Sequence, residues 1–126
     1  MSLRSPLGRA LGLGSAKAGT EHWWAQRVSA VALIPLTLWF LFSLLLLPNL
    51  GHETVRAWLQ FPLSGFLTIL LVAVLAYHSY LGATVIVEDY VHTEGLKILG
   101  LLSLQFLHVL VGGAGIFAIL HVAFGS

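Results

Sequence analysis

Long uninterrupted runs of apolar residues divide the chain into three segments that are separated by two short polar stretches. The first run, residues 28–47, carries no charged side chain, and the other two occupy residues 63–87 and 98–124. A helix needs about 20 apolar residues to cross the hydrocarbon core of a bilayer. Only helices and closed barrels can cross it, because lipid offers no partners to unpaired backbone groups. The pattern therefore predicts an all-α membrane protein with three transmembrane helices.

The polar stretches predict the remaining organisation. Residues 48–62 are typical of a polar loop, and a short interfacial helix is expected near Trp58. The first 20 residues contain Arg and Lys but no acid, which indicates a basic, flexible cytoplasmic tail, although a transit peptide has a similar composition. We thus expect a tail over residues 1–20 and a three-helix membrane anchor over residues 21–126.

The distribution of basic residues predicts how the spans are oriented, since Lys and Arg concentrate in cytoplasmic segments. The basic residues before the first run are Arg4, Arg9, Lys17 and Arg27. Arg56 alone lies in the first connection, and Lys97 ends the second. We therefore expect a cytoplasmic N-terminus and a C-terminus on the outer, periplasmic side of the membrane.

Composition agrees with a membrane location and excludes several functions. Hydrophobic residues make up 58% of the chain and charged residues only 9%, whereas soluble domains carry about 25% charged residues. A net charge of +1 provides no basic field for binding nucleic acid. The chain has no cysteine, which excludes disulfides, Cys-ligated iron–sulfur clusters and thiol catalysis by its own residues.

Three histidines fall within the apolar runs, where ionisable residues are rare and commonly functional. His121 is close to the outer end of the third run and is expected at the interface. His78 and His108 are expected at similar depth, each slightly on the cytoplasmic side of the middle of its span. A neutral imidazole at that depth either hydrogen-bonds a neighbouring helix or ligates a haem iron, and both interpretations stay open for each histidine taken alone.

The stretch "YHSYLGATVIVEDYVH" places further groups at helical spacing from His78. Gly82 follows after about one turn, where a small residue admits a neighbouring helix or a flat macrocycle. Asp89 follows eleven residues after His78, which in a regular helix is about 16 Å and three turns plus about 20°. With Tyr90 it forms an acid–phenol pair that suits a quinone, although an ordinary charged helix end has the same composition.

Taken together, these residues resemble those of a known family. The pattern of His78, Gly82 and then Asp89–Tyr90 resembles the smaller hydrophobic membrane anchor of bacterial succinate dehydrogenase (respiratory complex II). The stretch "AQRVSAVAL" is similar to the start of the first span in bacterial members. The resemblance covers nearly all of the chain beyond the N-terminal tail.

This resemblance implies a set of cofactors and residue roles. One haem b would be shared with a second membrane anchor (cytochrome b) subunit, and His78 would be the axial ligand from this chain. Tyr90 would hydrogen-bond ubiquinone, with Asp89 as its acidic neighbour. Arg27 and His22 would lie on the haem propionate side, although the spacing between them differs by one residue from the family's.

The resemblance also implies partners and a location. A flavoprotein subunit and an iron–sulfur subunit would dock on the cytoplasmic face and oxidise succinate, so this chain would carry no succinate chemistry itself. It would link the tricarboxylic acid cycle to the respiratory chain from within the lipid bilayer. The expected location is the bacterial inner membrane, in preference to the mitochondrial inner membrane.

Three alternatives compete with this interpretation. His78 and His108 could ligate one haem within this chain, which would make it a self-contained bis-histidine cytochrome b. The chain could anchor a fumarate reductase, which runs the same chemistry in reverse. A small helical transporter or a purely structural assembly protein is the third alternative.

Overall fold

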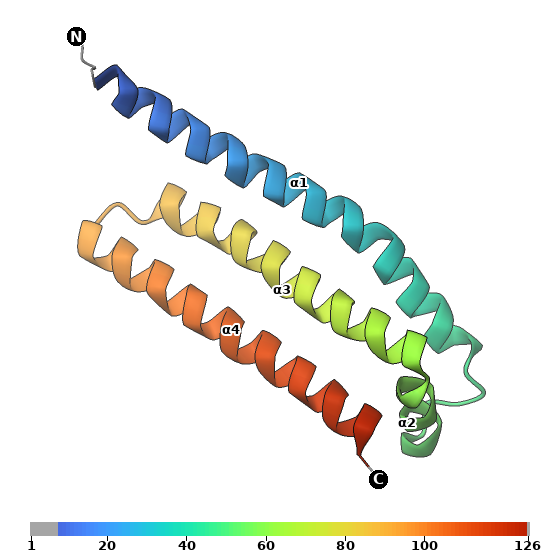
Figure 1. The fold of residues 1–126 in the computed structure, drawn as a ribbon. Coiled ribbons are helices and arrows are strands. Elements are labelled where there is room, and N and C mark those ends of the chain that lie inside the picture. The colour runs from blue at the N-terminus through green and yellow to red at the C-terminus, as the bar shows by residue number, and fades with distance from the viewer. Residues whose placement is uncertain (1–7, 126) are drawn as a thin grey trace.

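The computed structural model describes residues 8–125, and side chains within its first helix are described from residue 19 onward. The described residues form four helices, α1 (Gly8–Leu46), α2 (His52–Gln60), α3 (Pro62–Tyr90) and α4 (Glu94–Phe124) (Figure 1). Three segments are long and apolar enough to cross a membrane: Gly19–Leu46 within α1, α3 and α4. No strand occurs within residues 8–125. The predicted all-α architecture with three spans is therefore confirmed, and α2 is the short helix expected near Trp58.

The helices are longer than the predicted spans, most of all at the N-terminus. Residues 8–20 belong to α1 and are not a separate coil, which differs from the predicted boundary after residue 20. A helix that is already nucleated gains one hydrogen bond for each residue added, and no proline interrupts residues 8–20. Residues 1–7 of the predicted tail lie outside the described residues.

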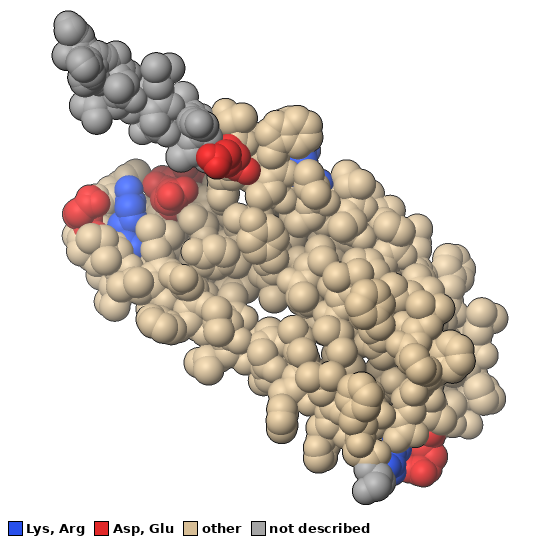
Figure 2. Space-filling view, in the orientation of Figure 1, with Lys and Arg blue, Asp and Glu red and all other residues tan. Residues whose placement is uncertain are grey.

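The central element is α3, which packs against both α1 and α4, while α2 packs against α3 and α4. The start of α1, the end of α3 and the start of α4 lie at one end of the molecule (Figure 1). The C-terminus and α2 lie at the other end. Charged side chains gather toward these two ends, and a broad uncharged belt separates them on the face shown (Figure 2).

Small residues bring α4 close to α3. A Cβ atom added to Gly112 would lie 3.2 Å from the Ala76 Cβ, and one added to Gly115 would lie 3.3 Å from a Val72 methyl carbon. Close backbone approach of this kind strengthens helix association in lipid, where the hydrophobic effect provides no driving force. Most large apolar side chains of the described helices are nevertheless exposed. These side chains are therefore available to lipid or to other subunits.

A tight turn joins α2 to α3. Phe61 ends one helix and precedes the next, and Pro62 occupies the first turn of α3, where its missing N–H is no loss. Gly65 is buried in this turn, and an added Cβ atom would lie only 2.7 Å from the backbone oxygen of Leu59. The turn thus has room for a hydrogen atom at residue 65 but not for a methyl group.

We expect Gly65→Ala to destabilise the fold, because backbone must move to relieve the contact. Overpacking of this kind costs about 1–3 kcal/mol, which would lower the thermal unfolding midpoint of the purified protein. Gly113→Ala is the matched control, since an added Cβ atom there has no neighbour within 4 Å. An unchanged midpoint in the Gly65→Ala protein would contradict the tight approach of α2 to α3.

Candidate functional site

His78 lies in α3 and faces α1. Its Nδ1 atom is 2.9 Å from the hydroxyl oxygen of Ser29, which is only 5% exposed. The same hydroxyl donates to the backbone carbonyl of Gln26, one turn earlier in α1, at 3.0 Å. The histidine is therefore held against the first span by a buried hydrogen-bond chain.

These two hydrogen bonds of Ser29 assign the tautomer of His78. A carbonyl oxygen can only accept, so the single proton of the Ser29 hydroxyl goes to Gln26. The contact between Ser29 and His78 then requires the imidazole proton to be on Nδ1. The lone pair of Nε2 has no hydrogen-bond partner among the described residues. It is consequently available to a metal.

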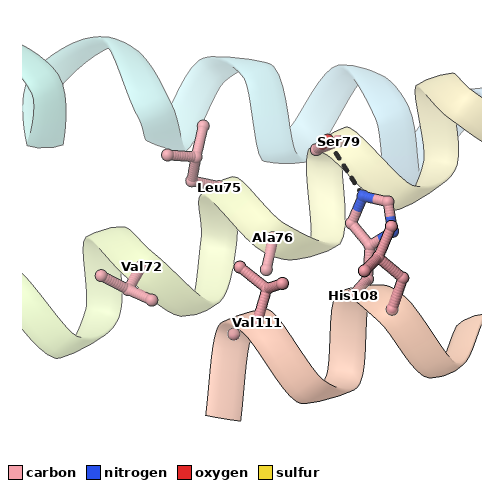
Figure 3. A pocket seen from close by; sticks show the side chains of 8 residues that line it. Val72, Leu75, Ala76, Ser79, His108 and Val111 are labelled. Atoms are coloured by element: carbon pink, nitrogen blue, oxygen red, sulfur yellow. Dashed lines mark hydrogen bonds between the residues drawn. The ribbon is translucent and has the colours of Figure 1, made fainter. Parts of the chain in front are cut away.

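His108, in α4, has the opposite arrangement. Its Nδ1 atom donates to the carbonyl of Leu104 at 2.9 Å, and its Nε2 atom accepts from the hydroxyl of Ser79 at 3.1 Å (Figure 3). Both ring nitrogens are therefore used within the chain. This contact agrees with the predicted similar depth of the two histidines, because Ser79 directly follows His78 in α3.

The two histidines also border different surfaces. His108 and Ser79 line an apolar groove of about 340 Å³ between α3 and α4, together with Val72, Ala76 and Val111 (Figure 3). His78 points instead toward α1. The described residues contain no group of three His, Asp or Glu side chains that could hold a metal ion.

A cavity of about 470 Å³ between α1 and α3 begins one turn from His78. Its lining residues are Gly19, His22, Trp23, Gln26, Gly82 and Val85. Two buried polar atoms in this wall, His22 Nε2 and Gln26 Oε1, have no hydrogen-bond partner among the described residues. Such atoms are costly in an apolar environment unless something pairs with them. The cavity therefore suits a ligand that has both apolar surface and polar groups.

Arg27, Asp89 and Tyr90 are not among the residues that line this cavity. Arg27 is exposed and lies over the ring of Trp23, with its guanidinium carbon 5.3 Å from the ring centre. The helix α3 stays regular through Tyr90, so Asp89 follows Val85 by one turn on the cavity side. Tyr90 is 77% exposed, and no described residue hydrogen-bonds its hydroxyl.

Comparison with known proteins decides the family. A family model described as "Succinate dehydrogenase/Fumarate reductase transmembrane subunit" matches residues 1–112. The chain belongs to this family. The resemblance predicted from His78, Gly82 and the Asp89–Tyr90 pair is thereby confirmed at the level of the family.

Individual members of the succinate dehydrogenase/fumarate reductase family align with most of this chain. A succinate dehydrogenase hydrophobic membrane anchor subunit from Rickettsia bellii is 32% identical over 94% of each chain. The one from Paracoccus denitrificans is 32% identical over 97% of this chain and 94% of its own. A succinate dehydrogenase membrane anchor subunit from Reclinomonas americana is 30% identical over 74% and 80%. No solved structure matched the chain.

Sequence analysis did not identify two residues of the candidate site, Ser29 and Gln26. With His22 they recur at the i, i+4, i+7 spacing that marks one face of a helix. A polar stripe on one side of an otherwise apolar span indicates the side that faces protein rather than lipid, and it could have identified these residues. The stripe does not reveal which residue of α3 it meets, because that depends on how α1 and α3 rotate against each other.

Proposed function

We propose that this chain is the membrane anchor of a succinate:quinone oxidoreductase. In this role His78 provides one axial ligand to a haem b, and Tyr90 with Asp89 forms part of the ubiquinone site. The observation that carries the proposal is the free Nε2 lone pair of His78, fixed by Ser29 at mid-span in a chain of this family. The chain itself performs no succinate chemistry.

The surroundings of His78 fit a haem. A neutral imidazole with its proton on Nδ1 presents Nε2 to iron, and a hydrogen-bonded second nitrogen is usual for such ligands. The adjoining cavity has an apolar wall and two polar atoms, His22 Nε2 and Gln26 Oε1, which no described residue hydrogen-bonds. We assign His22 and Arg27 to the propionate side, where a guanidinium pairs well with a carboxylate. When bound, the haem supplies a one-electron carrier within the membrane.

The end of α3 fits a quinone headgroup. Tyr90 carries an exposed hydroxyl that can donate to a quinone carbonyl, and Asp89 adds an acceptor beside it. The apolar faces of α1 and α3 continue from this end into the span, where an isoprenoid tail would lie. Because α3 is helical from His78 to Asp89, both proposed sites occupy one side of one helix.

Charge and topology support the orientation of this anchor. Arg27 and Lys97 lie toward the end of the molecule that also holds Asp89 and Tyr90, whereas Arg56 lies in α2 at the other end. We therefore propose that the first end faces the cytoplasm of a bacterium. The iron–sulfur and flavoprotein subunits would dock there, close to Tyr90, and a second membrane subunit would supply the other haem ligand.

His108 argues against the self-contained cytochrome. A bis-histidine haem within this chain would need the Nε2 lone pair of His108, which already accepts from Ser79. Its Nδ1 atom is also committed, to the carbonyl of Leu104. The family description covers fumarate reductases too, but the relatives from Rickettsia bellii and Paracoccus denitrificans are succinate dehydrogenase subunits, which favours electron flow from succinate to quinone.

Affinity purification from membranes through a tag on this chain tests the proposed function. We expect a flavoprotein, an iron–sulfur protein and a second membrane chain to copurify, and the mixture to show a haem b spectrum. The complex should reduce a quinone with succinate. Isolation of this chain alone with a bound haem b would support the self-contained cytochrome instead, and a haem-free preparation without partners would support a transporter or assembly role.

A further inference from the structure

We infer that Ser29 is a positioning residue for the haem ligand, which fixes the tautomer and ring orientation of His78. The inference rests on the proposed function, since it assigns Ser29 a role only if His78 ligates iron. Ser29 is not a ligand itself. It acts through the hydrogen bond between its hydroxyl oxygen and His78 Nδ1, across the contact between α1 and α3.

The environment of Ser29 makes this bond effective. The side chain is 5% exposed and within a span, so neither water nor lipid headgroups compete for it. Its proton is already engaged by the carbonyl of Gln26 at 3.0 Å, which polarises the oxygen toward accepting from His78. Of the two ring nitrogens of His78, only Nε2 is then free to face a ligand.

A second serine–histidine hydrogen bond in the same protein, between Ser79 and His108, does not leave the histidine free to ligate a metal. Ser79 donates to Nε2 of His108 and removes the lone pair that a metal would need. Ser29 accepts from Nδ1 of His78 and leaves that lone pair free. Both bonds could hold helices together, but only the one made by Ser29 prepares a ligand.

The bond should change the iron as well as the ring. A hydrogen bond from Nδ1–H makes the imidazole a stronger electron donor, and loss of such partners typically weakens metal binding about 10- to 100-fold. A stronger donor favours ferric over ferrous iron. We therefore expect Ser29→Ala to shift the haem midpoint potential to more positive values and to weaken haem retention by about tenfold or more.

The test uses the complete membrane complex, purified with Ser29→Ala or Ser29→Thr in this chain. The measurements are haem per complex after dilution, the haem midpoint potential, and the electron paramagnetic resonance line width of the ferric haem. Ser29→Thr keeps the hydroxyl and should behave as the wild type. Ser79→Ala and Ser64→Ala are matched controls, since one removes a serine–histidine bond and the other a buried serine hydroxyl away from His78.

The outcomes separate this inference from the proposed function. A positive shift, a broadened signal and weaker haem retention in Ser29→Ala alone, restored by threonine, would support the positioning role. Wild-type values in Ser29→Ala would overturn it, and so would the same changes in Ser79→Ala or Ser64→Ala. Equal loss of the complex in the alanine and threonine variants would assign Ser29 to helix packing. Retention of haem in His78→Leu would instead refute the ligand assignment on which the inference rests.

Discussion

We expect the complex that carries His78→Leu to lack the absorption bands of haem b. Leucine has similar bulk and preserves the apolar span, but it provides no lone pair to iron. Among the described residues, the Ser29 hydroxyl loses its partner at His78 but keeps its bond to the Gln26 carbonyl. The complex should therefore still assemble. A reduced-minus-oxidised difference spectrum of the purified complex, normalised to its flavin, measures the loss.

His108→Leu is the matched control for this loss. It removes a second histidine at the same depth, whose nitrogens bond Ser79 and Leu104. We expect that complex to keep a full complement of haem b, with at most a small loss of stability. If His108→Leu abolished the haem spectrum and His78→Leu did not, the assignment of the two histidines would be reversed. Loss of the spectrum in both variants would point to a haem held within this chain.

The spans could be predicted from the sequence because their signal is local. Each apolar run is long enough to cross a bilayer as a helix, which satisfies all of its backbone hydrogen bonds within the segment. The spacing from His78 to Asp89 was equally informative, because helical geometry is the same in every chain and α3 is regular to Tyr90. The predicted boundary after residue 20 is not the start of the helix, since α1 begins at Gly8. Hydropathy marks where lipid begins and not where a helix begins.

The difference between the two histidines could not be predicted, because it depends on contacts between helices. In the sequence, His78 and His108 are both single imidazoles in apolar runs at similar depth. In the structure, one meets an acceptor oxygen from α1 and the other meets a donor hydroxyl from α3. Which serine each ring reaches follows from how three helices rotate about their axes. Helical periodicity within one segment carries no information about that rotation.

We expect Tyr90→Phe to reduce succinate-driven quinone reduction about 5- to 150-fold while haem b stays bound. The proposed role of Tyr90 is one hydrogen bond to a quinone carbonyl, and an unmade bond of this kind costs about 1–3 kcal/mol. Each 1.36 kcal/mol corresponds to a factor of about ten in rate. Phenylalanine keeps the ring at the end of α3, where Tyr90 is 77% exposed, so the fold should not change.

Two comparisons locate the defect. Electron transfer from succinate to a water-soluble artificial acceptor, which bypasses the membrane site, should equal that of the wild type in Tyr90→Phe. Tyr77→Phe is the matched control, because Tyr77 is a half-exposed tyrosine of the same helix. It lines a second groove, on the His108 side of α3, and does not line the α1–α3 cavity. Full quinone reduction in Tyr90→Phe would remove Tyr90 from the quinone site. An equal decrease of quinone reduction in both variants would show that the effect is not specific to the end of α3, because loss of either exposed phenol would then slow the reaction.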